Sequence, residues 1–456
     1  MTFILPQVKP VRAKPARKRR NSIETIDVLV FLIPCLQLIR IKVVGVLNGS
    51  DLMMVAVFLY LAFRSRLRIA TPVGKWSLVL CALWLASQCM TDLVRHSAFA
   101  DYARGWSNVG LTLVSLAVLW TLLYGRPKRL ETYGWGLVIG SIVYLLVNPN
   151  EAMTGGAPGD IWKFGLAYPV SLGVFLLASR KECRGYWPII LAVMMGVINM
   201  AQGSRNAGGE CLAAALYLFV TSFSRRKNPD GSRLRPRTVV ALAACILLSV
   251  AGVIWIYGRA ASTGVLGEKA QETYEQESSG KYGVLLGGRT EMLSTLPAIY
   301  DSPILGHGSW AKEPIYIIEQ HQALLLLGYK FAAQLITPED LREGLIPTHS
   351  YFFGAWVDAG ILGAVFWAWI FILAARVLLR VYPANTVLLP AMAYLVFLLL
   401  WNVPFSPYGT QERITFPYTL VLMMTLMDTA SGKAVRVPAN KMKRKIQTTL
   451  APRPQY

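Results

Sequence analysis

Charged residues are scarce in this sequence, and their scarcity excludes an ordinary soluble domain. They make up 16% of the 456 residues, whereas soluble globular domains carry about 25%. Hydrophobic residues reach 54%, and the mean hydropathy is +0.43. The apolar residues come in long runs rather than in amphipathic periods. Most of the chain is therefore predicted to avoid water.

Cysteine is also scarce, and no cysteine spacing resembles a zinc site or a disulfide framework. None of the six cysteines falls between residues 258 and 349. We interpret them as small buried hydrophobic residues and expect neither a metal site nor a cofactor. They are Cys35, Cys81, Cys89, Cys183, Cys211 and Cys245.

The apolar runs predict an all-α polytopic membrane protein with about 12 transmembrane helices. A hydrocarbon core about 30 Å thick needs about 20 mostly apolar residues per helix. Several runs are short or interrupted, so the expected count carries an error of one or two. The predicted spans are 26–47, 51–64, 75–91, 106–124, 133–148, 162–179, 186–202, 207–224, 238–257, 350–379, 385–402 and 414–430.

The distribution of charge predicts the orientation of these spans. The net charge is +21, and 32 of the 46 Lys and Arg residues lie in the two tails and in alternate connections. Clustering between apolar runs is typical of membrane orientation, not of a nucleic-acid surface. We expect basic cytoplasmic tails at 1–25 and 431–456, which touch membrane lipids. The membrane domain, 26–430, then holds a large, partly helical periplasmic loop at 258–349, between helices 9 and 10.

Two arginines outside the basic clusters are candidate anion-binding residues. Arg205 stands at the predicted start of a helix, among glycines that allow close approach. Arg289 precedes a predicted short helix over 290–300, and helix N-termini favour anions such as phosphate. A guanidinium adds bidentate hydrogen bonds to phosphate oxygens. The alternatives are that Arg205 only reaches to the membrane interface and that Arg289 pairs with Glu291 or another loop acid.

The end of the large loop carries an imidazole and an acid. His349 lies where the loop re-enters the membrane, and an imidazole can take a proton from a hydroxyl. Asp358 lies about two turns further on, where a carboxylate needs a partner such as an arginine or histidine. The alternative for His349 is a hydrogen-bonded interface residue. His307 is a candidate for local structure or substrate contact. The apolar segment 315–328 predicts a short interfacial or buried helix.

The order of these short motifs resembles the O-antigen ligase and O-antigen polymerase superfamily. The motifs are Ser204-Arg205, Gly288-Arg289, the S-P-I-L-G-x-G pattern from Ser302, and the H-S-Y-F pattern with Asp358, Gly360 and Gly363. The resemblance is strongest over 203–210 and 287–365. The chain departs from the family pattern at Asp358, where Glu is frequent, and at Ser350, where Asn is common.

The resemblance implies a metal-independent membrane glycosyltransferase for polysaccharide biosynthesis in the cell envelope. It implies a donor glycan on undecaprenyl diphosphate at the periplasmic face of the bacterial inner membrane. The acceptor would be a glycan or a lipid A-core, and polysaccharide export or assembly proteins would be partners. Arg205 and Arg289 would bind the diphosphate, His349 would act on the acceptor hydroxyl, and His307 and Asp358 would contact substrate.

Two other classes of function remain open from the sequence. A multispan lipid or glycan transporter or flippase also predicts about twelve spans with intramembrane charges. Such proteins usually carry repeated halves with matching broken helices, whereas this chain shows one large late loop and no internal repeat. The other class is a structural assembly scaffold without transferase activity.

Overall fold

The structure is a computed structural model of the chain, and the part it describes is almost entirely helical. The ninth predicted span, 238–257, and both predicted tails lie almost wholly outside the described residues. Those residues are 24–69, 71–149, 160–180, 182–183, 185–227, 244, 252, 255, 257–265, 267–334, 337–381 and 387–431.

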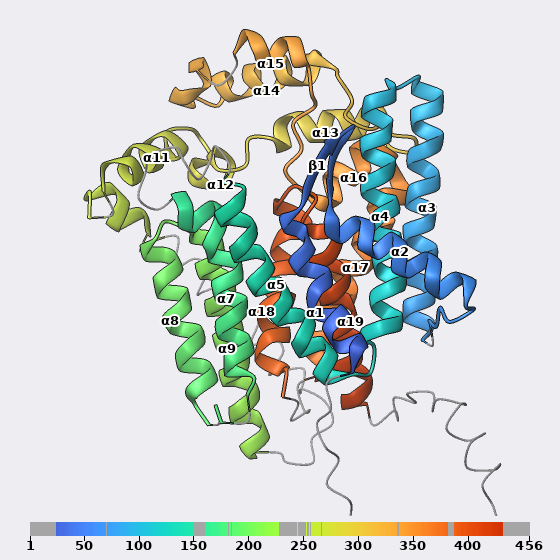
Figure 1. Cartoon of the computed structure of the whole chain (residues 1–456). Helices are drawn as coiled ribbons and strands as arrows, with labels where there is room; N and C mark the ends of the chain where they lie inside the picture. Colours follow the sequence, from blue (N-terminus) through green and yellow to red (C-terminus); the bar gives the residue numbers. More distant parts are fainter. Residues whose placement is uncertain are drawn as a thin grey trace, which may run out of the picture.

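A bundle of apolar helices forms the body of the molecule (Figure 1). Among the described residues, four helices have the length and apolarity to cross a membrane: α3 (Pro72–Arg95), α4 (Phe99–Leu123), α5 (Pro127–Val147) and α17 (Ile361–Val381). This is an integral membrane protein, whereas the expected count of about twelve spans stays a prediction. The other bundle helices are α7 (Ala167–Ala178), preceded by the π-helical turn η2 (Trp162–Leu166), α8 (Trp187–Ala201), α9 (Arg205–Lys227), α18 (Leu389–Phe405) and α19 (Glu412–Ala430).

The first predicted span, 26–47, is wrong in its second half. Helix α1 (Thr25–Cys35) contains Pro34 and is followed by a short turn, η1 (Leu36–Leu38). Strands β1 (Arg40–Val43) and β2 (Gly45–Asn48) then form an antiparallel hairpin. Arg40 and Lys42 alternate with apolar neighbours here, and this period of two belongs to a strand.

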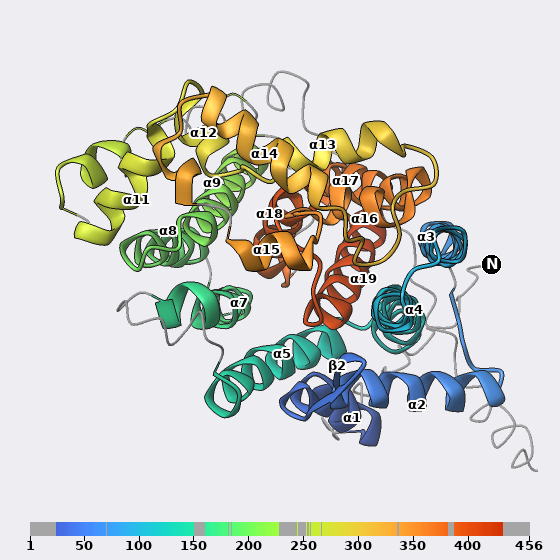
Figure 2. The same ribbon diagram turned by 90° about the horizontal axis from the view of Figure 1, so that it is seen from above.

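Helix α2 (Gly49–Phe63) occupies the second predicted span but differs in direction from its neighbours. Seen from above, α3 and α4 point along the line of sight, whereas α2 lies lengthwise across the view (Figure 2). A buried ion pair fixes its first turn, because Arg413 Nη1 lies 3.1 Å from Asp51 Oδ2. Arg413 Nε also donates to Asn108 Oδ1 at 2.8 Å, which holds that amide in place on α4.

The tenth predicted span, 350–379, is two helices rather than one. Helix α16 (Tyr351–Ala359) ends at Gly360, where φ is +66° and ψ is −157°, and α17 begins at the next residue. Backbone angles of this kind are almost restricted to glycine. Apart from Asp358, the apolar run continues on both sides of the break, so mean hydropathy did not separate the two helices.

The large predicted loop forms a helical cap over one end of the bundle (Figure 1). Its α13 covers part of the predicted 290–300 helix, and α14 corresponds to the predicted apolar segment 315–328. Arg95, at the last residue of α3, hydrogen-bonds to the cap. The first residue of α3 therefore lies about 35 Å away, at 1.5 Å per residue. The cap helices are α11 (Glu268–Ser278), α12 (Gly283–Gly287), α13 (Met292–Asp301), α14 (Pro314–Leu326), η3 (Lys330–Gln334) and α15 (Pro338–Glu343).

Candidate functional site

A glycine turn of the cap docks into the break between α16 and α17. His307 N donates to Val357 O at 2.7 Å, and Ile361 N donates to Ile304 O at 3.2 Å. A Cβ on Gly306 would lie 2.6 Å from Gly360 N, and a Cβ on Gly360 would collide with the Ile304 carbonyl. The S-P-I-L-G-x-G motif and Gly360 are therefore two halves of one backbone contact.

Helix α3 holds the same turn from the other side. The Asp92 carboxylate accepts hydrogen bonds from Ser309 N and Ser309 Oγ, each at 2.7 Å. Arg95 Nη2 donates to Ser302 Oγ at 2.8 Å and to Gly306 O at 3.0 Å. Sequence reasoning missed both α3 residues. The sequence did contain a sign of them, because two charged residues just beyond the end of the predicted span 75–91 need partners.

His349 is held between the cap and the membrane helices. Ser350 caps α16, since its Oγ accepts from Phe353 N at 3.0 Å, and the same hydroxyl donates to Val403 O at 2.8 Å. On the other flank, Thr295 Oγ1 donates to the Pro347 carbonyl at 2.8 Å. The backbone on both sides of His349 is thus fixed, while its side chain stays 54% exposed.

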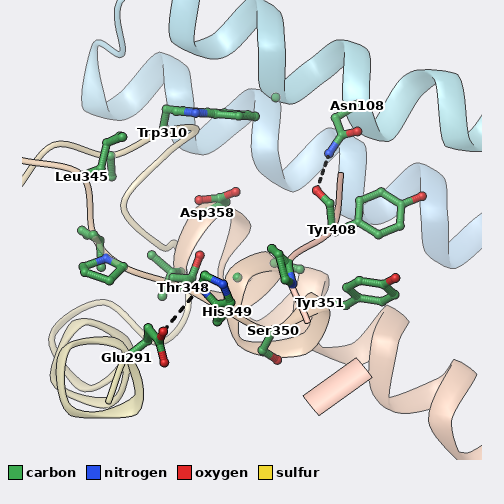
Figure 3. A pocket seen from close by; sticks show the side chains of 18 of the residues that line it. Asn108, Glu291, Trp310, Leu345, Thr348, His349, Ser350, Tyr351, Asp358 and Tyr408 are labelled. Carbon is green, nitrogen blue, oxygen red and sulfur yellow. Dashed lines mark hydrogen bonds and ion pairs between the residues drawn. The ribbon is translucent and has the colours of Figure 1, made fainter. Parts of the chain in front are cut away.

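Glu291 is the acid nearest to the His349 ring. The distance from His349 Nδ1 to Glu291 Oε1 is 3.7 Å (Figure 3). This is an ion-pair distance, longer than a hydrogen bond, so the carboxylate lies where it can attract a positive charge on the ring. Sequence reasoning considered Glu291 only as a partner for Arg289, which the structure does not pair with it at ion-pair distance.

Arg289 lies on aromatic rings of α18. Its guanidinium carbon is 5.4 Å from the Trp401 ring centre and 5.3 Å from that of Phe405. Burial lowers the pKa of Arg289, and the charge of Arg205 lowers it further, against the opposing effect of Glu291. Its one described hydrogen bond goes to the Gly288 carbonyl at 3.2 Å. Most of its donors are therefore open to an anion.

Arg205 begins α9, as predicted, and is engaged by an acid of the cap. Its two terminal nitrogens each donate to one oxygen of Glu277 at 3.1 Å. Its guanidinium carbon also lies 4.7 Å from the Tyr257 ring centre. Burial acts to lower the pKa of Arg205, but Glu277 outweighs it and the pKa is raised. Arg205 and Arg289 are close enough to influence each other electrostatically, so the cap gathers two guanidinium groups in one region.

A cavity of about 580 Å³ lies on the other side of His349. Figure 3 shows the labelled side chains around it, including Trp310, Asp358 and His349. Asp358 has no hydrogen-bond or ion-pair partner for its carboxyl group among the described residues, so the arginine or histidine expected beside it is not there. A second cavity, of only about 10 Å³, lies against Arg289 and shares three lining residues with the first, namely Glu291, His349 and Ser350.

His307 is used within the cap and lines neither cavity. Its Nδ1 lies 2.7 Å from Glu313 Oε1, and its Nε2 lies 2.7 Å from the Ala298 carbonyl. Its ring also meets Tyr316 edge to face, with 5.4 Å between ring centres. This geometry favours local structure, the first of the two roles considered for it. The structure thus gathers Arg289, His349 and Asp358 around the two cavities, with Arg205 coupled to Arg289.

No group of three or more His, Cys, Asp and Glu side chains in the described ranges is arranged to hold a metal ion. The site combines two guanidinium groups, one imidazole–carboxylate pair and a cavity lined by aromatic, apolar and polar side chains. Such a set can bind an anion, take a proton from a hydroxyl and hold a second, uncharged molecule.

Residues 190–368 match a family model described as O-antigen ligase. The matched segment runs from α8 into α17 and contains Arg205, Arg289, His307, His349 and Asp358. The comparison with curated proteins found no match. The resemblance inferred from the order of the motifs is therefore confirmed as a family domain in this segment.

Proposed function

We propose that this chain, whose residues 190–368 carry an O-antigen ligase family domain, transfers a glycan from undecaprenyl diphosphate to an acceptor hydroxyl. The observation that carries the proposal is the position of His349. It lines both the 580 Å³ cavity and the smaller cavity against Arg289. The imidazole thus lies between a cavity of substrate size and Arg289, the residue that would contact the diphosphate.

The proposed step is a single displacement at the anomeric carbon of the donor glycan. His349 takes the proton of the acceptor hydroxyl, and the acceptor oxygen forms a bond to that carbon. The bond from the carbon to the diphosphate oxygen breaks, and the diphosphate leaves with the electron pair. Glu291, 3.7 Å from His349 Nδ1, orients the ring and stabilises the imidazolium that forms.

The two arginines stabilise the charge that develops on the diphosphate. Arg289 has donors that no described residue uses, and its aromatic support from Trp401 and Phe405 fixes the plane of its guanidinium. Arg205 is held by Glu277, so a bound diphosphate shares or replaces that carboxylate. Preorganised donors of this kind supply the stabilisation that a metal ion gives in other transferases.

The site lies at the end of the bundle that carries the cap. In the proposed orientation this end faces the periplasm from the bacterial inner membrane, and both termini are cytoplasmic. Arg126, in the connection between α4 and α5, and Arg129, in the first turn of α5, lie beyond the far end of α4, which agrees with that orientation. The acceptor is a growing glycan for a polymerase of O-antigen or exopolysaccharide, or a lipid A-core for a ligase.

Reconstitution tests this proposal directly. The purified full chain in proteoliposomes is given undecaprenyl diphosphate-linked glycan and candidate acceptors, and products are resolved by mass spectrometry. Transfer is expected in wild type and strongly reduced in Arg289→Ala and His349→Ala. Arg342→Ala, on the exposed helix α15, is the matched control. Full transfer by both site variants would overturn the proposal, and so would lipid flipping without any transfer.

A further inference from the structure

The walls of the 580 Å³ cavity combine aromatic faces with amides. Trp310 lines the cavity and is 38% exposed. Tyr351 and Tyr408 line the opposite part of it (Figure 3). Gln88 and Gln320 also belong to the lining, and both are buried residues. Small-molecule sites of about 300–1,000 Å³ are typically apolar and aromatic with a few fixed polar groups. The cavity has that character.

Two buried amides in this wall have unused hydrogen-bonding capacity. Gln88 is 2% exposed and donates to Ser309 Oγ at 2.8 Å, yet its Oε1 has no partner in the described structure. Gln320 is 5% exposed as a residue, and its amide, which has no hydrogen bond to a described residue, is open to the cavity rather than enclosed. Since a buried polar atom nearly always has a hydrogen-bond partner, the unpaired Oε1 of Gln88, with the open amide of Gln320, points to a ligand that carries hydroxyl groups.

The wall of the cavity carries acidic side chains but no basic ones among the described lysines and arginines. Glu291, Asp340 and Glu343 line it. Asp340 remains ionised, because hydrogen bonds from Thr337 lower its pKa. The guanidinium group of Arg289 lies against the smaller cavity, which His349 also lines. An anion is therefore favoured on one side of the imidazole and repelled on the other.

We infer that the 580 Å³ cavity binds the acceptor sugar, and that it selects a neutral or amino sugar over an acidic or phosphorylated one. This inference rests on the proposed glycan transfer and narrows its acceptor. The Trp310 face packs on the C–H groups of the sugar ring. Gln88, Gln320 and Asp358 hydrogen-bond its hydroxyls, and a carboxyl group can do so in either protonation state. The bound sugar then presents one hydroxyl to His349.

Binding of simple glycosides tests the inference without any donor. The full chain in nanodiscs is mixed with a methyl glucoside, a methyl glucosaminide or a methyl glucuronide. Saturation-transfer NMR with irradiation of aromatic protons then reports contact with aromatic side chains, and empty nanodiscs give the background. The neutral and amino glycosides are expected to receive saturation, and the glucuronide is expected to receive little. Equal transfer to all three, or none to any, would overturn the inference.

Variants locate the binding in this cavity. Trp310→Ala is expected to abolish saturation transfer to the neutral glycoside, and Trp310→Phe to keep part of it. Trp187→Ala, an exposed tryptophan at the start of α8, is expected to change nothing. Glu343→Gln is expected to raise binding of the glucuronide, whereas Glu339→Gln, on the same helix but outside the lining, is not. Unchanged binding in Trp310→Ala and Glu343→Gln would overturn the inference.

The two proposals fail in different ways. If the protein transfers glycan but these glycosides bind elsewhere or without charge preference, the acceptor site is wrong and the transferase function stands. If the glycosides bind with the expected preference but reconstituted protein transfers nothing, the cavity is a sugar site and the proposed reaction is wrong. A fluorescence-based melting temperature for each variant shows whether a lost signal reflects unfolding.

Discussion

His349 Nδ1 lies 3.7 Å from Glu291 Oε1, and this pair joins the end of the large cap to the start of α13. The pair lies on the shared wall of the two cavities. The sequence predicted a catalytic role for His349, whereas it predicted Glu291 only as a salt-bridge partner of Arg289.

The pair predicts that Glu291 acts through His349. His349→Ala should lower the turnover of glycan transfer by about 10²–10⁴-fold, the usual contribution of a general base. Glu291→Gln keeps the size of the side chain but removes the charge that orients the ring, so it should lower kcat by less. The double variant should be no slower than His349→Ala alone, because residues that act as a unit are not additive. Independent, additive losses measured by initial rates would contradict the pairing.

Arg289→Lys separates charge from geometry at the diphosphate. Lysine keeps the positive charge but lacks the planar fork and the stacking on Trp401 and Phe405. Loss of a preorganised donor typically lowers kcat by about 10²–10³-fold, and we expect a loss of that order in single-turnover transfer. Arg342→Lys on α15 is the matched control. Wild-type rates in Arg289→Lys would mean that charge alone suffices.

Glu277→Gln tests whether the cap acid competes with the donor. Glu277 holds both terminal nitrogens of Arg205 at 3.1 Å, in the bidentate manner in which a phosphate would be held. Removing its charge should free the guanidinium and lower the KM for the undecaprenyl diphosphate donor. Glu275→Gln, an exposed residue of the same helix α11, should leave it unchanged. A raised KM in Glu277→Gln would show that the acid positions Arg205 instead.

Chelation of divalent cations tests the expectation of a metal-independent reaction. If guanidinium groups alone stabilise the leaving diphosphate, EDTA should leave the initial rate of transfer unchanged, and added Mg²⁺ or Mn²⁺ should not raise it. A transferase with a known metal requirement, assayed in the same vesicles, shows that the chelator is effective. Loss of transfer on chelation and its recovery with Mg²⁺ would contradict the expectation.

The sequence predicted the helical class, because this follows from local composition. Long apolar runs identify membrane helices, and isolated charges such as Arg205 and Arg289 are visible against them. The hairpin at 40–48 was missed because a 20-residue window averages over a four-residue alternation. The break at Gly360 was missed because its cause, the carbonyl of Ile304, is more than 50 residues away in the chain.

Hydrogen bonds and ion pairs between residues far apart in the sequence could not be predicted either, because local patterns do not encode them. Asp92 and Arg95 hold the turn at Ser302–Ser309 across more than 200 residues, and no local pattern encodes that distance. The sequence likewise proposed Glu291 for Arg289, whereas Glu291 lies beside His349. The types of side chain in the site were thus predictable, but their pairing depended on the fold.

Gly360→Ala should loosen the cap from the membrane helices. The residue has φ +66° and ψ −157°, a conformation that costs a non-glycine residue about 1–3 kcal/mol, and a Cβ would also collide with the Ile304 carbonyl. We expect a lower melting temperature and faster hydrogen exchange at His307 N and Ile361 N, which bond across this contact. Gly209→Ala is the matched control, because its Cβ would meet nothing within 4 Å inside α9. Unchanged exchange at both amides in Gly360→Ala would show that the turn docks without needing this glycine.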